Sequence, residues 1–168
     1  LGAGAMGSII GATLAKGGQE VVLVDPYKEH LDKVARDGLQ LKWPDRTETV
    51  RLCTCVNPAE ASPVDMVVLL VKGFHSEEAV KGAPGLFGES TYICSLQNGL
   101  SNDDILAGMF PRERILQGVM RMTGSLTGPG EVRANVGGDV AIYMGSIVQQ
   151  EVADNMARTM AGHLCAGG

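Results

Sequence analysis

The chain of 168 residues lacks features that mark several classes of protein. Its formal net charge is −5 at pH 7, so it offers no basic surface of the kind that binds nucleic acid. Its apolar runs have the length of strands, and none approaches the roughly 18 to 20 apolar residues of a membrane span. No signal peptide is visible. We therefore expect a cytoplasmic protein with neither a nucleic acid nor a membrane as partner.

Paired cysteine motifs are absent as well. The four cysteines have no C-x-x-C spacing and no neighbouring histidine to complete a zinc set: Cys53, Cys55, Cys94 and Cys165. We expect reduced, structural thiols and no metal site, which agrees with a cytoplasmic location.

A glycine-rich turn stands at the start of the chain. Gly2-Ala3-Gly4-Ala5-Met6-Gly7 reads as G-x-G-x-x-G. Gly2 lets the chain turn out of a strand, Gly4 lets the backbone approach a pyrophosphate, and Gly7 lets the following helix pack on the sheet. The anion would lie at a helix N-terminus, where free N–H groups favour negative charge. The alternative is a glycine-rich turn without a ligand.

The residues after this turn supply the context that a dinucleotide fold requires. Small and apolar residues recur at helical spacing over 8–16, and Gly17-Gly18 ends that helix. A β-branched strand follows over 20–25 and ends on Asp25. Only Leu1 represents the strand that should precede Gly2, so we expect further apolar residues upstream of it.

Asp25 bears on the choice of cofactor. A carboxylate at the tip of the second strand can accept hydrogen bonds from the adenosine ribose and repels a 2′-phosphate, which favours NAD over NADP. Lys28 lies three residues further on and can partly neutralise a phosphate, so NADP stays possible. The alternative for Asp25 is a solvated turn residue ahead of Pro26.

Strands and helices alternate through the rest of the chain, which predicts an α/β fold of Rossmann type with a doubly wound, mostly parallel sheet. A hairpin or edge addition is expected over 39–43 and 49–56, and a loop over 124–130. A terminal antiparallel pair over 131–135 and 139–145 should close the sheet, with a Gly137-Gly138 turn between its strands. The other expected strands cover 66–71, 91–96 and 114–120, and the other expected helices cover 28–36, 76–81 and 102–109.

Polar residues end several of these strands. Ligands of open parallel sheets bind beyond the carboxyl ends of the strands, so Asp25, Lys72, Asn98 and the segment around Thr123 should converge there. Lys72 and Asn98 are expected beside the nicotinamide half of the cofactor. The alternatives are a solvated strand-end cation for Lys72 and a left-handed Asn-Gly turn residue for Asn98. His75 is interpreted as a helix-start residue rather than a catalyst.

The end of the chain suggests a division into two parts. Residues 1–148 are predicted to form the dinucleotide-binding domain, and 149–168 the start of a helical linker or second domain. Val152, Met156 and Met160 recur at four-residue spacing, and this apolar stripe needs a partner. The alternative is an ordinary core helix that lies back on the sheet.

Four segments in this order resemble the N-terminal domain of ketopantoate reductases (2-dehydropantoate 2-reductases), over essentially the whole chain. They are Gly2–Ser8, Val71-Lys72-Gly73-Phe74, Gln97-Asn98-Gly99 and Gly128-Pro129-Gly130-Glu131-Val132. The resemblance implies that Gly2, Gly4 and Gly7 hold the pyrophosphate, that Lys72 lies by the nicotinamide ribose, and that Asn98 positions cofactor and substrate at the catalytic centre. Asp25 departs from the basic residue that is typical of NADP-using members.

The same resemblance implies hydride transfer from a nicotinamide to a small 2-keto acid, in particular ketopantoate to pantoate in pantothenate and coenzyme A biosynthesis. The proton-donating lysine and the substrate-orienting carboxylate of that family belong to a C-terminal helical domain, which this sequence lacks. We therefore expect this chain alone to be inactive, with a homodimer possible through the missing domain. Two alternatives stay open: a β-hydroxyacid dehydrogenase of the hydroxyisobutyrate type, and an NAD(H)-sensing Rossmann module without activity.

Overall fold

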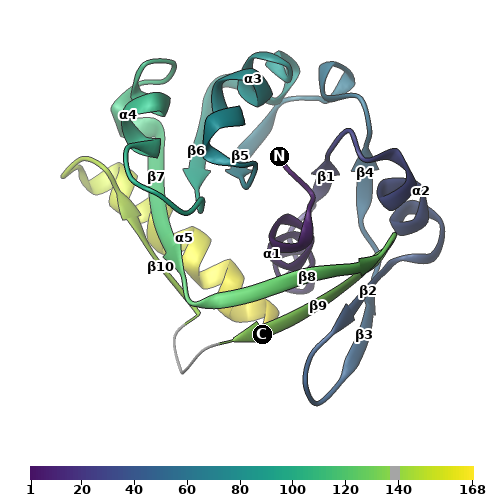
Figure 1. Ribbon diagram of the computed structural model, residues 1–168. Coiled ribbons are helices and arrows are strands. Elements are labelled where there is room, and N and C mark those ends of the chain that lie inside the picture. Colours follow the sequence, from purple (N-terminus) through teal and green to yellow (C-terminus); the bar gives the residue numbers. More distant parts are fainter. Residues whose placement is uncertain (137–140) are drawn as a thin grey trace.

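The computed structural model describes residues 1–136 and 141–168 (Figure 1). It has the α/β architecture that the sequence predicts. A short 3-10 turn covers Gly73–His75. The α-helices are α1 (Ala5–Lys16), α2 (Lys28–Asp37), α3 (Ser76–Lys81), α4 (Asn102–Ala107) and α5 (Glu151–Gly167). The strands are β1 (Val22–Val24), β2 (Leu39–Lys42), β3 (Thr47–Val50), β4 (Cys53–Cys55), β5 (Val64–Leu69), β6 (Phe87–Ser95), β7 (Ile115–Met120), β8 (Met122–Gly128), β9 (Glu131–Val136) and β10 (Ile142–Ser146).

The strands pair in three groups. β5, β6 and β7 are parallel neighbours, and β10 lies antiparallel along β7. β1 pairs with β4 in parallel, and the third group has the order β3-β2-β9-β8. Leu69 of β5 and Ile93 of β6 are fully buried, as expected for parallel strands that are covered on both faces.

The first residues of the chain join two of these groups. The Leu1 ammonium donates to the Val68 carbonyl (2.8 Å), and the Leu1 carbonyl accepts from the Leu70 N–H (2.9 Å). The Gly2 N–H donates to the Val24 carbonyl (2.9 Å). Leu1 therefore takes a strand position between β5 and the end of β1.

Helix α1 lies in the middle of the molecule (Figure 1). Ile9 packs in a core with residues of α2, β2 and β9, whereas Ile10 and Leu14 pack in a second core with residues of β6, β7 and α5. Contact with α5 is close, because a Cβ at Gly17 would lie 2.3 Å from the His163 carbonyl oxygen. The position of α1 fixes the glycine-rich turn ahead of it.

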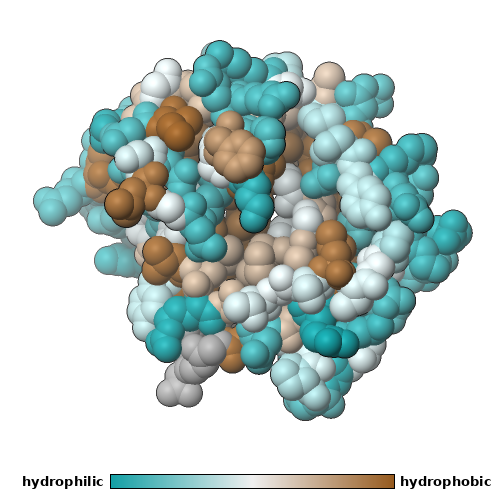
Figure 2. Space-filling model, viewed as in Figure 1, coloured by the Kyte–Doolittle hydropathy of each residue, from teal (hydrophilic) through white to brown (hydrophobic). Residues whose placement is uncertain are grey.

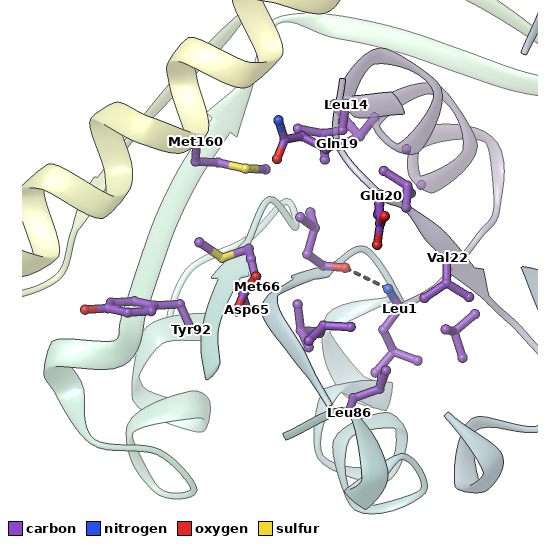
Figure 3. Close-up of a pocket in the computed structure, with 18 of the residues that line it drawn as sticks. Leu1, Leu14, Gln19, Glu20, Val22, Asp65, Met66, Leu86, Tyr92 and Met160 are labelled. Atoms are coloured by element: carbon purple, nitrogen blue, oxygen red, sulfur yellow. Dashed lines mark hydrogen bonds between the residues drawn. The ribbon is translucent and has the colours of Figure 1, made fainter. Parts of the chain in front are cut away.

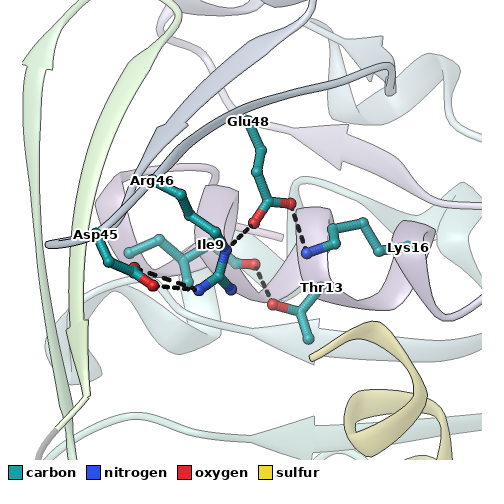
Figure 4. Close-up of polar contacts among 6 residues, drawn as sticks. All are labelled: Ile9, Thr13, Lys16, Asp45, Arg46 and Glu48. Atoms are coloured by element: carbon teal, nitrogen blue, oxygen red, sulfur yellow. Dashed lines mark hydrogen bonds and ion pairs between the residues drawn. The ribbon is translucent and has the colours of Figure 1, made fainter.

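An ion network holds the β2–β3 hairpin against α1 (Figure 4). Glu48 of β3 accepts from Lys16 of α1 and from Arg46, each at 2.5 Å. Arg46 also faces Asp45, at 3.3 Å. The hairpin expected over 39–43 and 49–56 is thus confirmed for β2 and β3, but the second segment is two strands, and its last part is β4, which pairs with β1.

The last three strands of the chain, β8, β9 and β10, differ from the prediction. The segment expected to be a loop over 124–130 is mostly β8, which forms a hairpin with β9 through the turn at Gly128–Gly130. The expected pairing of 131–135 with 139–145 is wrong, because β9 lies between β2 and β8 whereas β10 pairs with β7. The predicted Gly137-Gly138 turn, and the first residues of the strand expected after it, lie outside the described residues.

Helix α5 packs back onto α1 and β10. Its buried face consists of Ala153, Ala157, Met160 and Leu164, together with Gly167. The stripe expected from the sequence is wrong in its first member, since Val152 is 71% exposed. The division of the chain after residue 148 stays a prediction.

Candidate functional site

The glycine-rich turn is shaped by close backbone contacts. Gly2 has a φ of +92°, and a Cβ there would lie 2.7 Å from the Val71 nitrogen. A Cβ at Gly7 would lie 2.0 Å from the Gly2 carbonyl oxygen. Around Gly4, in contrast, a Cβ would meet nothing within 4 Å. Gly2 and Gly7 are therefore required by packing, whereas Gly4 leaves the outer face of the turn open to another molecule.

The N-terminus of α1 has none of the usual side-chain partners. Its N-cap is Gly4, no side chain caps it, and its first turn holds no acidic residue. Every other α-helix of the described chain has an acidic residue in its first turn: Glu29 in α2, Glu77 and Glu78 in α3, Asp103 and Asp104 in α4, and Glu151 and Asp154 in α5. The partial positive charge at the start of α1 is thus left for an anion from outside the chain.

Asp25 directly follows β1, as expected. Its Oδ1 accepts the Tyr27 N–H at 2.8 Å, which holds the carboxylate in a turn at the end of the strand. Lys28, the residue that leaves NADP possible, donates instead to Asp32 at 2.7 Å. In this arrangement Lys28 is directed along α2 rather than toward Asp25, and the negative charge at the strand tip is not offset by it.

Lys72 and Asn98 follow β5 and β6, which are neighbouring parallel strands, and both side chains are exposed. Lys72 makes no ion pair within the described part of the chain. The left-handed alternative for Asn98 is wrong, because Gly99 takes the positive φ of that turn (+111°) and Ser101 is the one non-glycine residue with positive φ among the described residues.

Gln97 links these two tips, a role that the sequence interpretation missed. Its amide Nε2 donates to the Val71 carbonyl (2.7 Å) and to Ser76 Oγ (2.8 Å). Its Oε1 accepts from Ser95 Oγ (3.0 Å). Gln97 is buried, so these bonds fix the backbone beside both Lys72 and Asn98. The signal in the sequence was a glutamine directly after an apolar run.

Two other predicted residues have different positions. His75 precedes α3, is exposed, and lies 3.2 Å from Glu78 Oε2, so it is a helix-start residue as expected. Thr123 belongs to β8 rather than to a strand-end loop. This strand nevertheless passes the start of α1, since a Cβ at Gly124 would lie 3.1 Å from Met6 Sδ. Figure 2 shows the face viewed in Figure 1, which is hollowed near its centre between α1 and the ends of β5 and β6.

A cavity of about 700 Å³ lies between β1 and β5 (Figure 3). It is lined by residues near the amino ends of these strands, and Gly2, Ala3 and Gly7 of the glycine-rich turn also line it. Leu1, Val22, Met66, Tyr92 and Met160 are among the residues around it. Because dinucleotides bind beyond the carboxyl ends of parallel strands, the part of the cavity near the amino ends lies away from the predicted crevice.

Other chemistry finds little support in the described residues. They contain no group of three or more His, Cys, Asp or Glu side chains that could hold a metal ion. Burial raises the pKa of the Cys94 thiol to about 12, so this cysteine stays protonated. None of the described helices is both long and apolar enough to cross a bilayer.

Comparison with known proteins identifies similar chains. The family model "Ketopantoate reductase PanE/ApbA" matches residues 1–149. A 2-dehydropantoate 2-reductase from Halobacterium salinarum is 35% identical over 142 residues, which are 84% of this chain and 46% of that protein. The structure of 2-dehydropantoate 2-reductase from Geobacter metallireducens matches with a TM-score of 0.87 and 28% identity, over 100% of this chain and 54% of that one. A D-mandelate dehydrogenase with NADH and anilino(oxo)acetate matches with a TM-score of 0.86 and 28% identity, over 99% and 53%.

Proposed function

The chain belongs to the PanE/ApbA ketopantoate reductase family, and we propose that it is the dinucleotide-binding part of an NAD(P)-dependent reductase of a small 2-keto acid, with ketopantoate as the first candidate. The observation that carries this proposal is the glycine turn, which is tightly packed at Gly2 and Gly7, open at Gly4, and continuous with an uncapped helix N-terminus. This chain spans about half the length of the curated relatives it matches.

The residues fit a dinucleotide along the edge where the parallel strands end. The amides at the start of α1 hold the pyrophosphate, because they have a free outer face and a favourable helix dipole. Asp25 accepts hydrogen bonds from the adenosine ribose. Lys72 and Asn98 lie at the nicotinamide half, where Lys72 binds the ribose and the Asn98 amide positions cofactor and substrate. These roles extend the similarity to a D-mandelate dehydrogenase that was solved with NADH.

The nicotinamide, when bound, supplies the hydride that reduces the keto group. The carbonyl oxygen gains negative charge in that step, so a donor must be aimed at it and a general acid must protonate it. Asn98 can donate a hydrogen bond to this oxygen, but the proton donor is expected in the part of the protein that corresponds to the second half of its relatives. A cytoplasmic location and a homodimer belong to the same proposal.

Absorbance at 340 nm tests the activity. The whole protein that contains this chain should oxidise NADH or NADPH when ketopantoate is added, whereas the 168-residue chain alone should bind the nucleotide without turnover. The keto acid of mandelate is a second substrate to assay, because of the mandelate dehydrogenase neighbour. Binding of NADH without turnover of any branched 2-keto acid would contradict a reductase and favour the NAD(H)-sensing alternative.

Asp25 tests the choice of cofactor. We propose a preference for NAD, because the carboxylate carries a charge that repels a 2′-phosphate and Lys28 is paired with Asp32. Asp25→Arg should shift the ratio of the NADPH and NADH dissociation constants toward NADPH by roughly tenfold, about the worth of one charge-assisted contact. Lys28→Met is the matched control, with little change in that ratio. An unchanged ratio in Asp25→Arg would remove Asp25 from the site.

A further inference from the structure

A buried chain of hydrogen bonds runs from the glycine turn to Gly130, in the turn between β8 and β9. Ser8 Oγ donates to the Ala3 carbonyl (3.0 Å), and His30 Nε2 lies 3.0 Å from the same Ser8 oxygen. On its other side, His30 Nδ1 accepts the Gly130 N–H (2.9 Å). Ser8 and His30 have no exposed surface at all. We call Gly130, His30, Ser8 and Ala3 the histidine relay.

The direction of every bond in the histidine relay follows from one obligatory donor. A backbone N–H can only donate, so His30 Nδ1 must be the acceptor for Gly130. The neutral imidazole then carries its proton on Nε2 and donates it to Ser8 Oγ. The Ser8 hydroxyl is left to donate to the Ala3 carbonyl. Burial favours this neutral form, because it lowers the pKa of His30.

The last bond of the relay fixes a peptide plane in the glycine turn. The described residues contain no cis peptide, so the carbonyl of Ala3 and the N–H of Gly4 point in opposite directions. Because the carbonyl is held inward by Ser8, the Gly4 N–H is directed outward. That is the side on which a Cβ at Gly4 would meet nothing within 4 Å.

The far end of the relay is rigid. Gly130 has a φ of +72°, and its carbonyl accepts the Gln40 N–H of β2 at 2.8 Å. A Cβ at Gly130 would lie 2.4 Å from Lys33 Cγ of α2. The turn at Gly128–Gly130 is thus held between β2 and α2.

We propose that Ser8 and His30 are positioning residues for dinucleotide binding: they transmit the fixed position of Gly130 to the Ala3–Gly4 peptide and so present the Gly4 N–H to the pyrophosphate. This inference rests on the proposed function. It needs no contact between either side chain and the nucleotide, because both act through the backbone of the turn.

Ser8→Ala and Thr13→Val form a matched pair of variants that tests the relay. Each removes one buried hydroxyl from α1, and the Thr13 hydroxyl donates to the Ile9 carbonyl at 3.0 Å within the helix (Figure 4). Ser8→Ala should weaken the binding of ADP and of NADH by roughly three- to tenfold, the effect of one lost buried hydrogen bond. Thr13→Val should bind both as the unmodified chain does.

Two substitutions of His30 separate the ends of the relay. Gln places an amide near Nε2 and keeps a donor for Ser8, whereas Asn places one near Nδ1 and keeps an acceptor for Gly130. Each variant breaks the relay at one end, so His30→Gln and His30→Asn should each weaken ADP binding by roughly threefold. Equal ADP affinity in Ser8→Ala, His30→Asn and Thr13→Val overturns the proposal.

A measurement without nucleotide keeps this test independent of the proposed function. The amide resonance of Gly4 and its hydrogen-exchange rate report the orientation of the Ala3–Gly4 peptide in the free chain. Ser8→Ala should shift both, and Thr13→Val should shift neither. If no variant and not even the unmodified chain binds ADP or NADH, the proposed function fails. If the Gly4 amide is the same in Ser8→Ala and Thr13→Val, the relay fails.

Discussion

The two halves of the proposed crevice are built on different principles. The half around α1 uses backbone amides whose shape depends on glycines and on the histidine relay. The half at the ends of β5 and β6 uses two exposed side chains, Lys72 and Asn98, whose backbone is fixed by the buried amide of Gln97. Changes in the first half should therefore act through shape and on every adenine nucleotide. Changes at Lys72 or Asn98 should each remove one contact, and they should weaken binding of the complete dinucleotide but not of ADP.

The largest effect is expected from Gly7→Ala. The new Cβ would lie 2.0 Å from the Gly2 carbonyl oxygen, and neither backbone can yield cheaply. Binding of both ADP and NADH should fall by roughly a hundredfold, which is the upper end of overpacking effects. Gly162→Ala is the control, because this exposed position in α5 has nothing within 4 Å and tolerates a methyl group. Isothermal titration calorimetry measures both; near-normal ADP binding by Gly7→Ala would show that the turn does not hold phosphate.

The second largest effect is expected from Gln97, which supports the half of the crevice at the ends of β5 and β6. Gln97→Leu leaves the Val71 carbonyl and the Ser76 and Ser95 hydroxyls without this partner, and the free energy of unfolding should fall by about 3 kcal/mol. Urea denaturation measures it. Gln40→Leu, which removes an exposed bond to Thr49, should cost less than about 0.5 kcal/mol. Binding of ADP by the folded Gln97→Leu chain should stay close to normal, and a large loss would mean that the two halves are not independent.

A smaller and more selective effect is expected at Lys72. Lys72→Met removes a cation beside the proposed nicotinamide ribose, so NADH should bind roughly tenfold more weakly while ADP binds as before. Lys81→Met is the matched control, since Lys81 is an exposed lysine of α3 that pairs with Glu77. Fluorescence titration of NADH and calorimetry with ADP give the two constants. Equal weakening of both ligands would place Lys72 at the pyrophosphate instead.

The smallest effect is a difference in pH dependence. Protonated His30 would point an Nδ1–H at the Gly130 N–H, and burial lowers the pKa of His30 from 6.5 although Asp25 acts against this shift. Tyr27 stacks on the same ring. A lowered histidine pKa means that the unfolded chain binds the proton more tightly. The contribution of His30 to stability is therefore complete above pH 6.5 and is lost as the pH falls below that value.

His30→Gln is the reference for thermal melts that test this pH dependence, because it differs from the unmodified chain only in lacking the histidine. The unmodified chain should lose more stability than His30→Gln between pH 6.5 and 5. Parallel curves for the two proteins would show that His30 is not held neutral by the fold.

Most of the fold and part of the site could be predicted from local patterns. The α1 helix, the hairpin of β2 and β3, and the buried strands β5 and β6 follow from periodicity over a few residues. The order of β8, β9 and β10 could not be predicted, because alternating residues in a strand do not specify the neighbour with which it pairs. The apolar stripe of α5 was misplaced for a related reason: alanines form much of its buried face, and their small size gives a weak signal.

Local residues suffice to specify the glycine turn, because Gly2 takes a φ that other residues avoid and Gly7 lies against the Gly2 carbonyl only five residues earlier. The sequence by itself also determined which residues follow the strands, Asp25, Lys72 and Asn98. Long-range packing alone brings His30 to Gly130, one hundred residues away, and Gln97 to the Val71 carbonyl. The reason is physical: a buried polar group needs a partner, but any segment that packing brings into reach can provide it.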